Sequence, residues 1–337
     1  MSSTASLPRL RALGLGLLVP TLLWACVGAA PTPQVIIVTP APAPTAPAVT
    51  PEIIYVTPAP TATPAPTPVP TPVPTAAPTP TPVAVVPADQ LAMPGKLLIC
   101  SDLPYPPQEF FDDQGNPIGS DIEIAQEIAR RLGLEPQILN SFFDTIIPAL
   151  TAGKCDIIAS AQNINADRLK QVDMIPFFQA GQSFVVAKGN PSGIRTRDDL
   201  CGKSVAAETS TTEVDFLNGT GDYAGQGLSA QCVKAGKAAI SVRTFPKDSD
   251  ALLALQGGQV DAYFADSPVA GYYVAQHGEA FDLSGVTLDV TKEGISVAKG
   301  HEALRDAVQA ALSAMIADGT YLAILTKYGQ EAGTIAP

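Results

Sequence analysis

The chain has 337 residues, of which 32 are Asp or Glu and 20 are Lys or Arg, and its formal net charge is −12. This acidic balance argues against a nucleic-acid-binding protein, because few basic side chains are present to displace counterions from a phosphate backbone. The two histidines, His277 and His301, lie far apart in the sequence, so neither a histidine-based metal site, a Ser-His-Asp triad nor a cofactor is expected.

The N-terminus has the features of an export signal. Arg9 and Arg11 precede an apolar run over residues 13–25, which is too short to span a membrane stably. The run ends in Leu-Trp-Ala followed by Cys26, which resembles a bacterial lipobox. We therefore predict that residues 1–25 are a lipoprotein signal peptide and that lipid on Cys26 anchors the chain to the outer face of the cytoplasmic membrane. The alternative is an ordinary signal peptide in which Cys26 is incidental.

Residues 26–94 are predicted to form an extended stalk. Within them, residues 31–87 hold 19 of the 33 prolines and a single charged residue, Glu52. Proline fixes φ and removes a backbone donor, so this segment favours a polyproline-type spacer over a helix or a strand. Such a stalk would hold the following globular part away from a membrane.

Short apolar segments then alternate with helical patterns. Residues 97–100 are typical of a buried strand, and residues 121–132 are typical of an amphipathic helix. Asp144 is predicted to cap a helix over residues 145–152, which leads into a strand over residues 155–160. The alternation predicts an α/β body with mostly parallel sheet covered on both faces.

The same unit recurs 105 residues later in the chain. Residues 147–156 and 252–261 both contain the pattern Ala-Leu-x-x-Gly-x-x-Asp, and each leads into a predicted strand. Ser249 takes the place of the capping Asp144 in the second copy. Helix, glycine and strand thus recur in the same order, which predicts two related lobes. The aspartates that end the two segments are predicted to be structural.

Polar residues follow the predicted strands, and ligands of open α/β sheets bind beyond the carboxyl ends of the strands. Arg168 lies just after Asn165, a predicted helix cap, so a guanidinium and free backbone N–H groups would together suit a carboxylate. Asp266, in the second lobe, would suit an ammonium group. An α-amino acid carries both charges and would bridge the lobes. The segments at which a site is expected are residues 101–105, 161–168, 208–212 and 266–267.

These segments resemble those of the bacterial extracellular solute-binding proteins of family 3, which serve polar amino-acid ABC importers. The resemblance covers about residues 96–328. It implies the type II periplasmic-binding-protein fold, in which two α/β lobes joined by two crossovers enclose a ligand cleft. The motifs that carry it are Ser-Asp-Leu-Pro-Tyr-Pro-Pro (101–107), Gly-Ser-Asp-Ile-Glu-Ile-Ala (119–125), Phe-Asp-Thr-Ile-Ile-Pro-Ala-Leu (143–150), Gly-Lys-Cys-Asp-Ile-Ile (153–158), Arg-Leu-Lys-Gln-Val-Asp (168–173), Thr-Thr (211–212) and Ala-Asp-Ser-Pro-Val-Ala (265–270).

The resemblance also implies where the lobes begin and end. Crossovers between them are expected near residues 184–188 and 290–297. Two C-terminal helices, over residues 302–318 and 321–328, are expected to pack on the first lobe. The first lobe would comprise residues 95–186 and 291–337, and the second lobe residues 187–290.

By the same resemblance, the cleft holds an amino-acid backbone. Arg168 would pair with the ligand carboxylate, helped by Thr212 and by backbone N–H groups near Asn163. Asp266 would receive the α-ammonium group, together with the backbone carbonyl of Ala161. These contacts would be the same for any α-amino acid.

The resemblance further implies a subsite for the ligand side chain. Tyr105 and Phe143 would enclose its aliphatic part, and Asp102 would reach its polar end, which suits a basic or an amide group. The chain departs from the family pattern at Glu208 and Ser210, where a neutral residue and a glycine are more usual. A polar L-amino acid is therefore expected, with its side chain left open.

The remaining cysteines fit an exported protein. Cys201 and Cys232 both fall in the second lobe, and we predict a disulfide between them. Cys100 ends one predicted strand and Cys155 begins another, so a parallel pairing would separate them by several residues of ~3.3 Å rise each. These two are therefore predicted to be free buried thiols.

The expected function is that of a substrate-binding component, not an enzyme, which captures an amino acid by hinge closure and delivers it to membrane permease subunits. A separate ATPase would supply the energy, because the chain has no phosphate-binding glycine motif. Two alternatives stay open. The same fold family includes exported cyclohexadienyl dehydratases, for which Glu208 or Glu213 would serve as the acid. The lobes would otherwise present their ligand to a membrane sensor.

Overall fold

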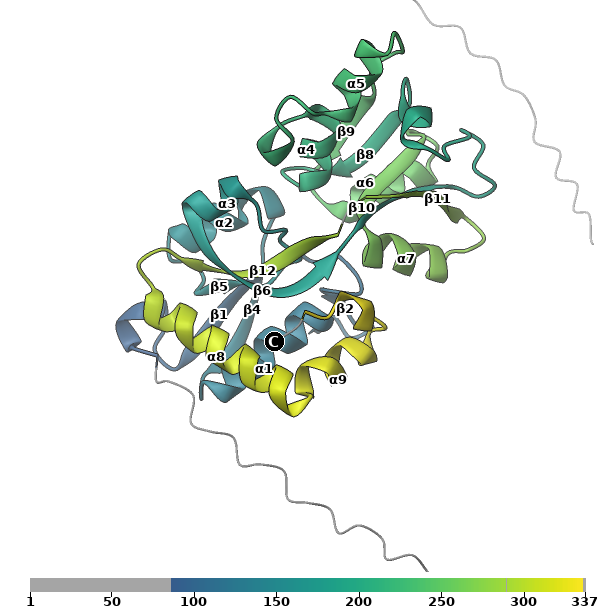
Figure 1. Cartoon of the computed structure of the whole chain (residues 1–337). Helices are drawn as coiled ribbons and strands as arrows, with labels where there is room; N and C mark the ends of the chain where they lie inside the picture. The colour runs from purple at the N-terminus through teal and green to yellow at the C-terminus, as the bar shows by residue number, and fades with distance from the viewer. Residues whose placement is uncertain (1–85, 289, 336–337) are drawn as a thin grey trace, which may run out of the picture. The chain divides into compact units, whose positions relative to one another are not determined.

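The computed structural model describes residues 86–288 and 290–335 (Figure 1). The predicted signal peptide, Cys26 and most of the predicted stalk lie outside these residues. The end of the predicted stalk, however, belongs to the folded body. Val86 is buried in the core of the first lobe, and the backbone N–H of Ala92 donates to Asp156 at 2.6 Å. The body is thus already folded at residue 86, before the predicted boundary at residue 95.

The first lobe is built on a five-stranded sheet. β1 runs parallel to β4 and β5, and β12 runs antiparallel to β5 and β6, so β12 alone is reversed. This arrangement confirms the mostly parallel sheet. The strands, in spatial order, are β4 (Glu135–Asn140), β1 (Lys96–Ser101), β5 (Ile157–Ile158), β12 (Thr291–Ala298) and β6 (Val172–Ala180).

Helices cover both faces of this sheet (Figure 1). Ile124 of α1, Leu312 of α8 and Leu325 of α9 share one apolar core with the sheet, so the C-terminal helices pack on the first lobe as predicted. Ile146 of α2 packs with Cys100 on the opposite face. The elements of this lobe are α1 (Ser120–Arg131), α2 (Phe143–Thr151), α3 (Ala166–Gln171), α8 (Glu302–Asp318), α9 (Thr320–Lys327) and the short pair β2 (Phe110–Phe111) and β3 (Pro117–Ile118).

The second lobe repeats this plan. Its five-stranded sheet again has one reversed strand, β7, which is antiparallel to β10 and β11. In each lobe the reversed strand is the one that arrives from the other lobe. α4 and α5 contribute to the core on one face, and α6 and α7 to the core on the other. The elements are β11 (Phe281–Thr287), β7 (Gln182–Ala187), β10 (Ala262–Asp266), β8 (Ser204–Glu208), β9 (Ser241–Phe245), α4 (Thr212–Asn218), α5 (Leu228–Lys234), α6 (Asp248–Gln256) and α7 (Ser267–Gln276).

Two chain segments cross between the lobes. The first crossover is at Gly181, between β6 and β7, which is earlier than the predicted residues 184–188. The second lies between β11, which ends at Thr287, and β12, which begins at Thr291, near the predicted residues 290–297. The first was misplaced because residues 172–187 are extended throughout and no turn marks the change of sheet. A Cβ at position 181 would lie 2.9 Å from the carbonyl oxygen of Leu288, so glycine permits the two crossovers to pass closely.

The internal repeat is present in the structure, although its helix caps differ from the prediction. α2 and α6 both have nine residues and begin 105 residues apart, at Phe143 and Asp248. Asp144 and Ser249 therefore lie inside the first turn and are not N-caps. The repeated aspartates are structural, as predicted. Asp156 accepts the backbone N–H of Leu98 at 2.6 Å, and Asp261 accepts that of Ser204 at 2.8 Å.

Both pairs of cysteines form disulfides. Cys201 and Cys232 are joined in the second lobe, which is the predicted pairing. Cys100 and Cys155 are joined in the first lobe, so the prediction of free thiols was wrong. β5 begins at Ile157 rather than at Cys155. Cys155 therefore lies in the segment before β5, so the rise of the strand does not separate it from Cys100. The Cα atoms of Cys100 and Cys155 are 5.8 Å apart.

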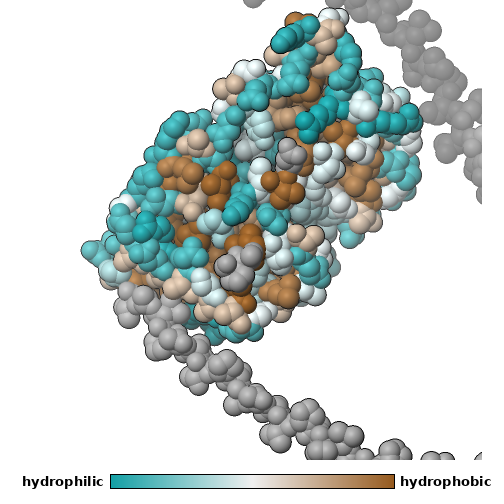
Figure 2. Space-filling view, viewed as in Figure 1, coloured by the Kyte–Doolittle hydropathy of each residue, from teal (hydrophilic) through white to brown (hydrophobic). Residues whose placement is uncertain are grey.

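No single helix among residues 86–288 and 290–335 is long and apolar enough to cross a membrane. α8 and α9 meet that criterion only together, and they are bent by 80° at their junction. Most of their apolar side chains lie in or against the core of the first lobe, whereas Leu322 is exposed. On the face shown in Figure 2, hydrophobic side chains form small groups among hydrophilic ones.

Candidate functional site

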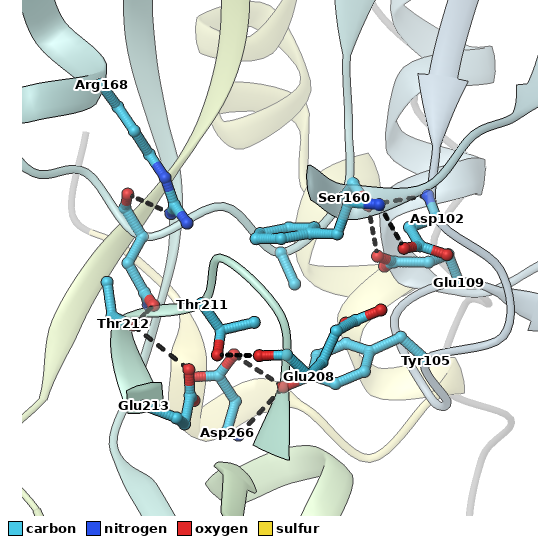
Figure 3. Close-up of a pocket in the computed structure, with 13 residues that line it drawn as sticks. Asp102, Tyr105, Glu109, Ser160, Arg168, Glu208, Thr211, Thr212, Glu213 and Asp266 are labelled. Carbon is cyan, nitrogen blue, oxygen red and sulfur yellow. Dashed lines mark hydrogen bonds between the residues drawn. The ribbon is translucent and has the colours of Figure 1, made fainter. Parts of the chain in front are cut away.

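A pocket opens between the two lobes, beyond the carboxyl ends of β1, β5, β8 and β10 (Figure 3). All eight residues that the sequence predicted as ligand-binding line it. The pocket therefore lies where the strand-end rule placed it. The lining residues are Asp102, Tyr105, Glu109, Phe143, Ser160, Ala161, Asn163, Arg168, Glu208, Thr211, Thr212, Glu213 and Asp266.

Arg168 offers a guanidinium that forms no ion pair with a carboxylate of the described residues. Asn165 caps α3 as predicted, and its side chain accepts the backbone N–H of Arg168 at 2.8 Å. The guanidinium donates to the carbonyl oxygens of Asn163 at 2.8 Å and Ser210 at 3.2 Å, and it lies 5.1 Å from the ring centre of Phe143. Among the residues described, no ion pair forms at this buried side chain. Burial lowers its pKa, but a guanidinium remains charged, so the site favours an anionic group.

Asp266 offers a carboxylate oxygen in the opposite wall. Its Oδ2 accepts the hydroxyl of Tyr105 at 3.0 Å, and its backbone N–H donates to the same hydroxyl. Oδ1 is buried and has no hydrogen-bond partner in the described part of the chain. Burial, followed by the charge of Glu213, raises the pKa of Asp266 well above its usual value. A cation beside Oδ1 would relieve both effects.

Tyr105 links the two lobes in addition to lining the pocket. It was predicted to enclose the aliphatic part of a ligand, and its hydroxyl also joins the first lobe to Asp266 of the second. Asn163 and Thr212 make a second link between the lobes, because the Thr212 hydroxyl donates to Asn163 Oδ1 at 2.5 Å. Ala161 has a φ of +43°, which is uncommon for a residue other than glycine and frequent at binding sites.

Asp102, the predicted selector of the ligand side chain, is already bound within the protein. Its Oδ1 forms an ion pair with Lys247 of the second lobe, and its Oδ2 accepts the backbone N–H of Phe143 at 2.6 Å. Lys247 also donates to the carbonyl oxygens of Leu103 at 3.2 Å and Ser141 at 3.0 Å. Both partners of this ion pair are largely buried, with side-chain exposures of 5% for Asp102 and 18% for Lys247.

The pocket is strongly acidic. Its lining contains five carboxylic acids and one basic side chain, Arg168. Burial, then the charge of Asp102, raises the pKa of Glu208 to about 11, and burial raises that of Glu213 to about 7. Glu109, Glu208 and Glu213 each have a buried oxygen without a partner in the described residues. In the same residues, no group of His, Cys, Asp or Glu is arranged to hold a metal ion.

The sequence prediction missed several of these residues. Ser160 lies just before one of the strand-end segments and has no distinctive pattern, whereas Thr211 lies in the Thr-Thr motif but was not assigned to the ligand. Glu109 and Lys247 lie beyond those segments, and Lys247 contacts the site from 145 residues away from Asp102. Glu208 was noticed only as a departure from the family and as an acid for a dehydratase.

The comparisons with known proteins agree with this geometry. The model of the bacterial extracellular solute-binding proteins, family 3, matches residues 97–331. The arginine-binding protein ArgT of Corynebacterium glutamicum is 30% identical over 253 residues, covering 75% of this chain and 80% of its own. The L-cystine-binding protein TcyJ of Escherichia coli K12 is 29% identical over 235 residues, covering 69% of this chain and 82% of its own.

Solved structures give the same result. An ancestral arginine-binding protein with bound arginine matches with a TM-score of 0.62 and 35% identity, over 69% of this chain and 98% of its own. The type II periplasmic-binding-protein fold is thereby confirmed. The relatives are non-enzymatic binding proteins, so the dehydratase alternative is set aside. The chain therefore belongs to the bacterial extracellular solute-binding proteins of family 3, as a polar amino-acid-binding protein of ABC transport.

Proposed function

We propose that this protein captures a polar L-amino acid outside the cytoplasmic membrane and delivers it to the permease subunits of an ABC importer. The observation that carries the proposal is a pair of ionisable groups in opposite walls of one cleft that form no ion pair with the described residues. Arg168 of the first lobe donates only to carbonyl oxygens within that part of the chain, and Oδ1 of Asp266 in the second lobe has no hydrogen-bond partner there. An α-amino acid supplies the complementary carboxylate and ammonium groups.

Ligand capture would work by closure of the two lobes. The crossover at Gly181 and the one between β11 and β12 join the lobes covalently, so they are the natural hinge. A ligand that bridges Arg168 and Asp266 contacts both lobes at once and therefore favours the closed form over the open one. The closed form would then dock on the permease.

The protein would act at the outer face of the cytoplasmic membrane, on the cell surface or in the periplasm. The predicted signal peptide, the lipid on Cys26 and the Pro-rich stalk would tether the lobes there. A separate ATPase would drive transport. A membrane sensor as the recipient of the ligand remains the alternative.

The proposal is tested by ligand binding to the Arg168→Ala variant. A thermal-shift panel of the twenty L-amino acids on the unmodified protein identifies a ligand, and calorimetry then gives its Kd. Loss of a charged partner in a buried site typically weakens binding by at least about 100-fold, so Arg168→Ala should lose measurable affinity while keeping its fold.

Lys170→Ala is the matched control, because Lys170 is a basic residue of the same helix that is exposed and paired with Asp167. It should bind like the unmodified protein. Absence of binding by all twenty amino acids would refute the proposed function. Retained affinity in Arg168→Ala would remove the assignment of Arg168 to the ligand carboxylate.

A further inference from the structure

The cation that neutralises Asp102 comes from the protein itself. Lys247 is the residue immediately before α6 in the second lobe, and its ammonium group lies among Asp102, Leu103 and Ser141 of the first lobe. It also lies 4.7 Å from the ring centre of Phe142. These contacts account for the donor capacity of an ammonium group. Asp102 therefore already has a cationic partner before any ligand binds.

The internal repeat places a second acid in the equivalent position. Asp156 accepts a hydrogen bond from the backbone N–H of Leu98 in β1, and Asp261 accepts one from that of Ser204 in β8. Because these two hydrogen bonds are equivalent, Leu98 and Ser204 occupy corresponding positions in the two lobes. Asp102 lies four residues after Leu98, and Glu208 lies four residues after Ser204. Asp102 and Glu208 are therefore counterparts at the same end of the same strand, one in each lobe.

Glu208 differs from Asp102 in forming no ion pair within the described residues. It is only 6% exposed and lines the pocket, and its carboxyl group shares a hydrogen bond with that of Asp102. Its Oε1 is buried without a hydrogen-bond partner among the described residues. Lys247, the cation next to it, is bound to Asp102, and no ion pair forms at Glu208 in the described part of the chain. Figure 3 shows its side chain extending from the second lobe toward Asp102 and Glu109.

Glu109 is less suited to the same task. Its Oε1 accepts the hydroxyl of Ser160 at 2.9 Å, and that hydroxyl oxygen in turn accepts the backbone N–H of Asp102. Glu109 thus belongs to a hydrogen-bonded group within the first lobe. Glu208 faces it from the second lobe, so a cation between them would add a contact that only the closed cleft provides.

We propose that Glu208 is the residue that selects a ligand with a cationic side chain, a guanidinium or an ammonium, and that it does so because Lys247 holds Asp102. This inference rests on the proposed function, since it concerns the side-chain end of the same cleft. Burial of a carboxylate without an ion-pair partner is unfavourable, and a ligand cation removes that cost, whereas a neutral side chain leaves it in place. The site would therefore discriminate between ligands by the charge of their side chains.

The test compares arginine with citrulline, which has the same length and a neutral ureido group in place of the guanidinium. Calorimetry on the unmodified protein should give a Kd for arginine at least about 100-fold lower than that for citrulline. Glu208→Gln should raise the arginine Kd by a similar factor and change the citrulline Kd by only a few-fold. Glu208→Asp should retain part of the preference. Glu279→Gln, an exposed acid of the same lobe, is the control and should change neither Kd.

A second variant tests the role of Lys247. In the Glu208→Gln background, Lys247→Met frees Asp102 and should restore arginine binding by at least about 10-fold, because Asp102 then becomes the unpaired acid. Equal affinity for arginine and citrulline in the unmodified protein would overturn the inference, as would an arginine preference that survives Glu208→Gln. In either case the proposed function stands if Arg168→Ala still abolishes binding. Failure to bind any amino acid would overturn both.

Discussion

Asp248 makes the stability of this protein depend on pH in a direction opposite to that of a salt-bridged acid. It begins α6, is 2% exposed, and accepts hydrogen bonds from the hydroxyls of Tyr263 and, at 3.3 Å, Tyr273. Burial raises its pKa from the ordinary 3.8 to about 7, although the two tyrosine hydroxyls act to lower it. The folded protein therefore holds this proton over a range of pH in which the unfolded chain has lost it.

The sign and size of the effect follow from proton linkage. Between about pH 4 and pH 7 the folded state binds one proton more at this site than the unfolded state, so the free energy of unfolding falls by about 1.4 kcal/mol per pH unit. The stabilisation is complete below the unfolded pKa and is lost as the pH rises through the folded one. Over the full shift, about 4 kcal/mol disappears.

The perturbation is Asp248→Asn, which imitates the protonated acid at every pH. Urea unfolding at pH 4.5, 5.5, 6.5 and 7.5 should show the variant close to the unmodified protein at the lowest pH and more stable by up to about 4 kcal/mol at the highest. Asp250→Asn, an exposed acid of the same helix, should run parallel to the unmodified protein. Parallel curves for Asp248→Asn, or a loss of stability at pH 7.5, would refute the reasoning.

Two further substitutions test the fold. Joint replacement of Cys100 and Cys155 by alanine removes a disulfide that closes a loop of 55 residues. The free energy of unfolding should fall by about 4 kcal/mol, and the Tm measured by calorimetry should fall by roughly 10 °C. An unchanged Tm would show that this disulfide does not contribute to stability. In Gly119→Ala the new Cβ would lie 2.1 Å from the carbonyl oxygen of Gln108, at a φ of +125°, so chemical unfolding should show a loss of several kcal/mol. A variant of normal stability would contradict that close contact.

Local patterns in the sequence determined most of the elements. The helix predicted from periodicity over residues 121–132 differs by one residue at each end in the structure. Such an element depends on periodicity and on nearby caps, which a single sequence displays. The helix that the family resemblance implied over residues 302–318 has those bounds in the structure. The residues of the site were also accessible, because the carboxyl ends of parallel strands converge wherever the sheet is formed.

Contacts between residues that lie far apart in the chain are determined by the tertiary structure. Lys247 reaches Asp102 across 145 residues, and Tyr105 reaches Asp266 across 161. Neither contact has a local signal, because each exists only when the two lobes pack together. The link between Cys100 and Cys155 likewise depends on where β5 begins, which a run of apolar residues does not reveal.

The same division between local patterns and tertiary contacts applies to the residues of the cleft. The sequence by itself determined that an arginine and an aspartate stand at strand ends in two related lobes, because that information is local and repeated. Only the tertiary structure decided which acids are already paired. Asp102 and Glu208 occupy equivalent positions in the two folded lobes, and the ammonium group of Lys247, the residue before α6, forms an ion pair with Asp102 and not with Glu208. Charge balance in a buried site is a property of the packed lobes rather than of any segment.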